Sequence, residues 1–198
     1  FKFRHRSKKN QIIYTTKKVK NDENILNLID NFLDEKNSFI FESVEKGKIK
    51  GRYTIFGKKP DKIWEFNNNN SYLIQNNKKI KLKDKPKILI EKIIEDFRFE
   101  TPKSLPKICS LISGYFSYDS IRYIEKIPNN CVNDLNLPDV RLLRPKILVI
   151  YDNLKKEIFY IFNIFKDEKI LNYQNEYDKI KSELFKLLIQ SSIKKIDI

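Results

Sequence analysis

The chain has 198 residues, 40% of them hydrophobic and 13% aromatic, and a formal net charge of +14. This length and composition are typical of one large or two small globular domains and exclude a disordered protein. No apolar run approaches the roughly 18 residues of a membrane span, and the basic start FKFRHRSKKN lacks the apolar region of a secretory signal.

The positive charge is carried mainly by lysine, because only seven of the 40 basic residues are arginine. Arginine is the side chain that binds phosphates and base edges with two parallel hydrogen bonds. The lysines are spread over the whole chain and accompany many Asn and Ile residues, as in proteins from AT-rich genomes. We therefore expect a solvated basic surface and no nucleic-acid partner, although a free-standing basic binding module stays open.

The sequence offers few residues for catalysis or metal binding. His5 is the only histidine, Cys109 and Cys131 are not in a CxxC motif, and the four glycines form neither GxGxxG nor a P-loop. We expect no catalytic residue, metal or cofactor in this chain, and free thiols in a cytoplasmic protein. Carboxylate, lysine or tyrosine chemistry stays open. Because the sequence has no methionine, we expect a piece of a longer protein.

The first elements follow a basic start. Residues 1–10 are expected to form a basic, flexible tail, and Gln11–Thr16 a strand. Asp22 is a suitable N-cap for a helix over Ile25–Leu33, where apolar residues recur at helical spacing.

The segment FIFESVEKGKIKGRYTIFG has the pattern of two strands around a charged loop. The predicted strands are Ser38–Glu42 and Arg52–Phe56. Gly47 and Gly51 bracket the loop, and Gly57 is expected to end the second strand. The pairs Glu-Ser and Arg-Tyr therefore occupy the two ends of one hairpin-like unit.

A β-meander and a helix are predicted next. KIWEF, SYLIQ and KIKL read as three short strands joined by Asn-rich turns, since Asn tolerates positive φ. Pro86 is expected to open a helix that reaches about Phe97. Its predicted buried side comprises Leu89, Ile90, Ile93, Ile94 and Phe97. Thr101–Lys107 contains two prolines and is expected to be a surface loop.

The remaining elements include the strongest hairpin pattern. A strand is predicted from Leu111, followed by a short helix from about Asp119 and an extended loop NDLNLPDVRLLRP. The strands Lys146–Asp152 and Glu157–Phe165 flank the turn NLKK. The last predicted element is an amphipathic helix over Leu171–Gln190. Its apolar stripe comprises Tyr173, Tyr177, Ile180, Leu184, Leu187 and Leu188.

Many short antiparallel strands with few helices indicate an α+β fold. We expect a β-sandwich or folded sheet with peripheral helices. The predicted boundaries are one domain over 11–170 and a linker helix over 171–198.

Three segments, in order, carry a resemblance to a known family. FIFESVEKGKIKGRYTIFG resembles the LLES…GRYS segment of anthranilate synthase component I. ISGYFSYDSIRYIEKIP is similar to that family's GYFGYD.VRY.E.LP segment, and DLNLPDVRLLRPKILVIYDNLKKEIFYI to the region that follows it. The resemblance covers about Gln11–Ile164, the family's N-terminal domain.

The resemblance implies a function for the whole protein. That function is conversion of chorismate to anthranilate and pyruvate in tryptophan biosynthesis, with ammonia from a glutamine amidotransferase subunit, component II. A C-terminal catalytic domain, which would bind chorismate and Mg²⁺, is expected to follow residue 198. The related aminodeoxychorismate synthase component I of folate synthesis is the nearest alternative.

In that family the Ser of the LLES motif belongs to the L-tryptophan feedback site, and it matches Ser43. A hydroxyl at a strand end can bind the polar end of an amino acid, and Glu42 could face the ammonium. Alternatively, Ser43 only satisfies backbone amides of its loop. Arg52 and Tyr53 are expected to support the site, through a salt bridge to a residue such as Glu42 and through core packing.

Two further groups of this region are expected to be structural. The aromatic residues Tyr115, Phe116 and Tyr118 are expected in the core or at an interface. Arg122 and Glu125 are three residues apart and are expected to pair on a helix surface.

Overall fold

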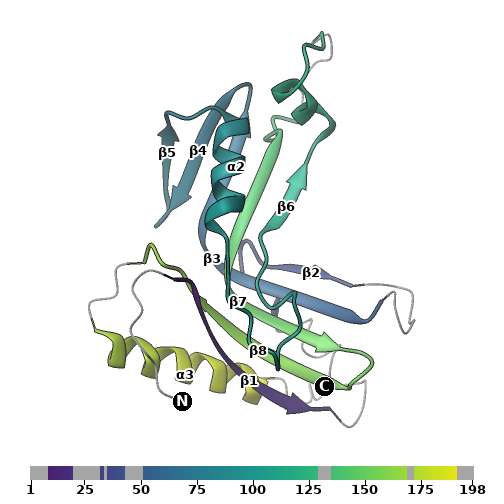
Figure 1. Ribbon diagram of the computed structural model, residues 1–198, viewed down its shortest axis with the longest axis vertical. Coiled ribbons are helices and arrows are strands. Elements are labelled where there is room, and N and C mark those ends of the chain that lie inside the picture. Colours follow the sequence, from purple (N-terminus) through teal and green to yellow (C-terminus); the bar gives the residue numbers. More distant parts are fainter. Residues whose placement is uncertain are drawn as a thin grey trace, which may run out of the picture. The chain divides into compact units, whose positions relative to one another are not determined.

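The computed structural model describes residues 9–19, 32–33, 35–42, 51–128, 135–168 and 172–190, and only the backbone of residues 173 and 187–190. The chain forms two compact units. Unit 1 comprises residues 1–59, 99–110 and 146–198, and unit 2 comprises residues 60–98 and 111–145. The hydrogen-bonded strand order is β1-β8-β7-β3-β4-β5, with β2 beside β3 and β6 beside β7. Figure 1 shows the elements along the chain.

Unit 1 is built on antiparallel strands that are distant in the sequence. β1 (Gln11–Lys18) pairs along its whole length with β8 (Glu157–Ile164), which also forms a hairpin with β7 (Val140–Asp152). β2 (Phe39–Phe41) pairs with the first part of β3 (Tyr53–Asn67). α3 (Tyr173–Gln190) packs on this unit.

Apolar residues at alternate positions of β7 and β8 form the core of unit 1. Phe162 and its neighbours two residues apart on β8 pack with Ile180 and Leu184 of α3. Because residues i and i+2 of a strand share a face, this alternation directs one row of side chains toward the helix. The predicted α3 stripe is confirmed at these two positions, where both side chains are buried.

Unit 2 contains a β-meander, a helix and a short strand that pairs with β7. β3 pairs with β4 (Asn70–Gln75), and β4 pairs with β5 (Lys78–Leu82). α2 (Pro86–Asp96), β6 (Ser113–Phe116) and the 3-10 helix η1 (Tyr118–Tyr123) complete it. Both turns of the meander place two Asn residues at positive φ, Asn68–Asn69 and Asn76–Asn77, as predicted.

The α+β prediction with antiparallel strands is confirmed. The predicted boundaries 11–170 and 171–198 stay predictions. The predicted tail over 1–10 and the helix over 25–33 lie outside the described residues, except for Lys9, Asn10, Phe32 and Leu33.

Three strands are longer than predicted, and β1 runs two residues beyond Thr16. β3 runs through Gly57 instead of ending there, so that Tyr53–Phe56 and KIWEF belong to one strand of 15 residues. Gly57 lies opposite Phe39, and a Cβ at this position would overlap the Phe39 ring. The glycine therefore makes room for an aromatic ring on the neighbouring strand, and it does not break β3.

β7 begins at Val140, inside the segment that was predicted to be a loop. The strand pattern of buried residues at alternate positions was not recognised in the sequence, because Arg144 is charged and Pro145 follows it. In the structure Val140, Leu142 and Arg144 are all buried. Arg144 Nε donates to Asp61 Oδ1 at 2.8 Å, and its Nη2 donates to Asp61 Oδ2. This pairing neutralises the buried guanidinium and allows the strand.

Exposed apolar side chains correct two further predictions. Ile94 of α2 was expected to be buried but is 64% exposed, whereas Ile93 is buried. The aromatic residues Tyr115, Phe116 and Tyr118 were expected in a core or at an interface, and the core alternative is wrong, because Phe116 is 58% and Tyr118 84% exposed. Arg122 pairs with Asp119 and not with Glu125.

Candidate functional site

The described residues of the predicted site, Glu42, Arg52 and Tyr53, lie at one end of the β2–β3 pair, whose strands are labelled in Figure 1. The register sets Phe41 opposite Ile55, so that Glu42 and Arg52 are both found at this end of the two strands. Glu42 is exposed, and Ser43 lies outside the described residues. The sequence prediction that Glu-Ser and Arg-Tyr occupy the two ends of one unit is therefore confirmed for Glu42, Arg52 and Tyr53.

Arg52 forms its ion pair with Asp152, at the end of β7, and not with Glu42. Its Nε lies 3.1 and 3.2 Å from the two carboxylate oxygens of Asp152, and its Nη2 lies 2.7 Å from Oδ2. Asp152 is almost fully buried, and Arg52 is partly exposed. This bidentate geometry fixes the direction of the guanidinium, and with it the start of β3.

Asn153 of the β7–β8 turn holds the start of β3 through hydrogen bonds to backbone carbonyls. Asn153 N–H donates to the carbonyl of Arg52 at 2.8 Å, and its side-chain amide donates to the carbonyl of Gly51 at 3.3 Å. Gly51 has φ of 78°, which favours glycine. Gly51 and Arg52 are thus anchored to a hairpin about 100 residues further along the chain.

The Asp152 carboxylate is held in its charged form. It accepts hydrogen bonds from the amides of Leu154 at 3.0 Å and Lys155 at 3.1 Å, in addition to those from Arg52. Burial alone would raise the pKa of Asp152, but the hydrogen bonds from Arg52 and from these amides outweigh burial and lower the pKa.

Tyr53 packs beside this ion pair. The Arg52 guanidinium carbon lies 4.9 Å from the centroid of the Tyr53 ring, within the range of a cation–π interaction. The side chain is half-buried, and burial raises the pKa of its hydroxyl. The geometry of Arg52 and Tyr53 is that of a support for the strand start.

A first prediction follows from the charge of Asp152. The Asp152→Asn variant is expected to lose about 2 kcal/mol of unfolding free energy at pH 7, because Asn supplies no charge to the Arg52 hydrogen bonds. The native pKa is below the ordinary 3.8, so this contribution is present above pH 3.8 and disappears as the pH falls through the lowered native value. Urea unfolding from pH 7 to pH 2 measures the difference.

The matched control for this prediction is Asp84→Asn. Asp84 pairs with Lys92 at 2.7 Å, but both side chains are about half exposed, so the loss is expected to stay below about 0.5 kcal/mol. A stability difference between wild type and Asp152→Asn that does not change with pH would contradict the assignment.

In unit 2, Asp139 joins two of the segments that carried the family resemblance. Its Oδ2 accepts from the Tyr123 hydroxyl at 2.7 Å and from the Asn68 amide at 3.0 Å. Its backbone N–H donates to the Phe66 carbonyl, and its carbonyl accepts from the Ser117 N–H, both at 2.8 Å. Sequence reasoning missed this residue, although it lies in the LPD motif and Tyr123 in the IRY motif.

The described residues offer little toward catalysis. In the described part of the chain, no three His, Cys, Asp or Glu side chains cluster in a way that could hold a metal ion. Cys109 is a buried free thiol, and burial raises its pKa. No helix among the described residues is long and apolar enough to cross a membrane.

Comparison with curated proteins identifies relatives over most of the chain. The chain is 31% identical over 154 residues to "Anthranilate synthase component 1" of Cereibacter sphaeroides, which covers 75% of this chain and 31% of the relative. It is 31% identical over 174 residues to the protein of the same name from Acetivibrio thermocellus, which covers 86% of this chain and 35% of that one. The chain is homologous to anthranilate synthase component 1.

The chain spans about a third of the length of these anthranilate synthase relatives. A crystal structure of anthranilate synthase component I from Streptococcus pneumoniae TIGR4 matches 83% of the chain and 34% of its own, with a TM-score of 0.54 and 18% identity. That match supports the fold. No protein-family model matches the sequence.

Proposed function

We propose that this chain is the N-terminal regulatory part of an anthranilate synthase component 1. The complete protein would be a cytoplasmic lyase that forms anthranilate and pyruvate from chorismate, with ammonia from a component II amidotransferase. The observation that carries the proposal is the homology to anthranilate synthase component 1 over three quarters or more of the chain. Chorismate and Mg²⁺ are assigned to a catalytic domain outside these 198 residues.

The proposal also assigns L-tryptophan to a feedback site at Ser43, with Glu42 as a weaker contributor. What supports this assignment is that the residues on both sides of Ser43 are held in place. β2, which ends just before Glu42, is paired with β3, and Arg52 is held by Asp152 and Asn153. Feedback would then act as a ligand-dependent equilibrium between two arrangements of this part and the catalytic domain.

Exposed apolar side chains support a partner for unit 2. Between residues 116 and 137, five described large apolar side chains are more than half exposed. They are Phe116, Tyr118, Ile124, Leu135 and Leu137. Soluble monomers rarely expose this much apolar surface close together in the sequence, and we assign it to contact with the protein's own catalytic domain or with component II.

The exposed apolar residues give a second prediction. The 198-residue chain alone is expected to self-associate at high concentration, and a Tyr118→Lys/Leu137→Lys double variant is expected to do so at higher concentrations only. Analytical ultracentrifugation measures this, with Lys103→Ala/Lys107→Ala on the exposed loop of unit 1 as control. If the unmodified chain stays monomeric at millimolar concentration, the expectation is contradicted.

The experiment that tests the function is an assay of the complete gene product. We expect chorismate, ammonium and Mg²⁺ to yield fluorescent anthranilate and one pyruvate for each anthranilate. Formation of an aminated chorismate without pyruvate would assign the chain to the aminodeoxychorismate branch. Retention on nucleic acid with a steep salt dependence and no chorismate turnover would favour a basic binding module.

A further inference from the structure

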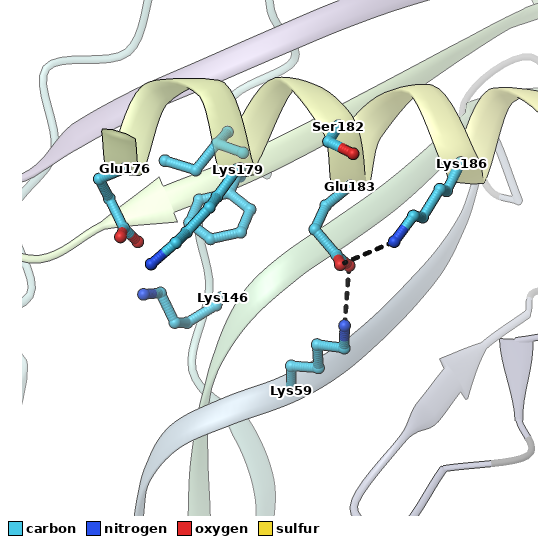
Figure 2. Close-up of a pocket in the computed structure, with 9 residues that line it drawn as sticks. Lys59, Lys146, Glu176, Lys179, Ser182, Glu183 and Lys186 are labelled. Atoms are coloured by element: carbon cyan, nitrogen blue, oxygen red, sulfur yellow. Dashed lines mark hydrogen bonds and ion pairs between the residues drawn. The ribbon is translucent and has the colours of Figure 1, made fainter. Parts of the chain in front are cut away.

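A pocket of about 420 Å³ lies in unit 1 between α3 and the strands beneath it (Figure 2). This volume is within the range of small-molecule sites in proteins. Its lining residues come from α3, β3, β7 and β8. The pocket is distinct from the β2–β3 end described above, because it contains none of Glu42, Arg52 or Tyr53.

The floor of the pocket is apolar. Phe162 of β8 and Ile180 of α3 are both buried members of the unit 1 core, and both line the pocket. An aromatic ring and a branched aliphatic chain side by side can cover the apolar body of a small ligand. The floor therefore favours an organic molecule over an inorganic ion.

Four lysines surround this floor, and two of them are held by Glu183. Lys59 Nζ lies 2.8 Å from the Glu183 carboxylate, and Lys186 Nζ lies 3.9 Å from it (Figure 2). The hydrogen bond from Lys59 is the main cause of the lowered pKa of Glu183. Because Lys59 and Lys186 already pair with the Glu183 carboxylate, this side of the pocket attracts a further anion only weakly.

The other two lysines are at the opposite end. Lys146 Nζ lies 2.7 Å from Glu168 and 5.0 Å from the centroid of the Phe162 ring, so that it is fixed directly above the floor. Among the described residues Lys179 has no ion pair, and it lines the pocket together with Lys146 and Glu176. Figure 2 shows the Lys179 and Lys146 side chains pointing toward one another. An ammonium group has three donors, so Lys146 and Lys179 both keep donors for a ligand.

The charges around the pocket define the ligand's charge. The four lysines face Glu176 and Glu183, and Glu168 neutralises Lys146 from outside the lining. Four cations therefore stand against three carboxylates, which leaves one positive charge. A monoanion balances this charge, whereas a dianion would be repelled by Glu176.

We infer that this pocket binds a small organic monocarboxylate, with its carboxylate between Lys146 and Lys179 and its apolar body on Phe162 and Ile180. This inference does not rest on the proposed function, because it uses none of the residues assigned to feedback or to contact with a catalytic domain.

The test uses the complete gene product that contains these residues and benzoate as the probe. Titration calorimetry is expected to show benzoate binding that is about tenfold weaker in Lys179→Gln, the loss of one charge-assisted hydrogen bond. Lys181→Gln, two residues along the same helix and outside the lining, is the matched control and is expected to leave affinity unchanged. Benzamide, the neutral analogue, and phthalate, the dianion, are expected to bind at least tenfold more weakly.

Lysine acylation followed by mass spectrometry locates the bound probe. Saturating benzoate is expected to reduce labelling of Lys179 several-fold and to leave labelling of Lys181 unchanged. The inference is overturned if benzoate does not bind at millimolar concentration, if Lys179→Gln binds as tightly as wild type, or if Lys179 is not protected. In each case the chorismate assay is unaffected and tests the proposed function separately.

Discussion

A Ser43→Phe variant of the complete synthase is expected to make anthranilate at the wild-type rate and to require at least tenfold more tryptophan for inhibition. The expectation rests on the proposed feedback site. A bulky side chain would fill the space for the amino acid's polar end, and a hydroxyl would be lost. Because feedback is a coupling of about 1–3 kcal/mol between two sites, loss of one hydrogen-bonding residue is enough to remove most of it.

The measurement is anthranilate fluorescence at increasing tryptophan concentration, with direct binding of tryptophan measured in parallel. Ser38→Phe is the matched control. Ser38 lies directly before β2, at the other end of that strand, and its hydroxyl donates to the Glu35 carbonyl at 2.7 Å. Unchanged tryptophan inhibition in Ser43→Phe would show that Ser43 only satisfies the backbone of its loop.

A Gly114→Ala variant is expected to lose about 3 kcal/mol of stability in unit 2. Gly114 has φ of 155°, and it lies opposite Leu142 in the β6–β7 pair. An added Cβ would meet the backbone of Arg141 and Leu142, at 2.9 Å from the Leu142 Cα. Backbone atoms inside a strand pair cannot move aside, so β6 would have to separate from β7.

Gly57→Ala gives a matched comparison, because the added methyl group there meets the side chain of Phe39. The double variant Gly57→Ala/Phe39→Leu is expected to restore stability, because the smaller side chain at position 39 leaves room for the added methyl group. No side-chain substitution is expected to rescue Gly114→Ala. Urea unfolding followed by Trp64 fluorescence reports on unit 2, since Trp64 is the only tryptophan of the chain and packs in that core. An unchanged unfolding midpoint in Gly114→Ala would contradict this reading of the β6–β7 pair.

The sequence predicted those elements whose stabilising contacts are local. The turn NLKK and the apolar runs around it were sufficient for the β7–β8 hairpin, and Pro86 with the helical repeat was sufficient for α2. Asn68 and Asn76 identified the turns of the meander, because a left-handed backbone is a property of the residue itself.

Two of the incorrect predictions involve partners that are distant in the sequence. The start of β7 was missed because Arg144 is neutralised by Asp61, 83 residues away. Arg52 was expected to pair within its own hairpin, but its partner Asp152 is 100 residues away. No local pattern contains this information. The positions of Glu42, Arg52 and Tyr53 at one end of the β2–β3 pair followed from the sequence, whereas the partner of Arg52 did not, and the feedback site at Ser43 stays a prediction.

The pairing of β1 with β8 has a consequence for synthesis of the protein. Among the described residues, the strand partners of Gln11–Lys18 are residues 157–164, so about 150 residues are made before the first strand can pair. At ~5–20 residues per second this interval is on the order of ten to thirty seconds on the ribosome. All of unit 2 emerges during that interval, and its strands pair with segments made within the same period. A nascent chain that stalls before residue 157 would carry an unpaired strand edge, the surface that chaperones bind and from which aggregation starts.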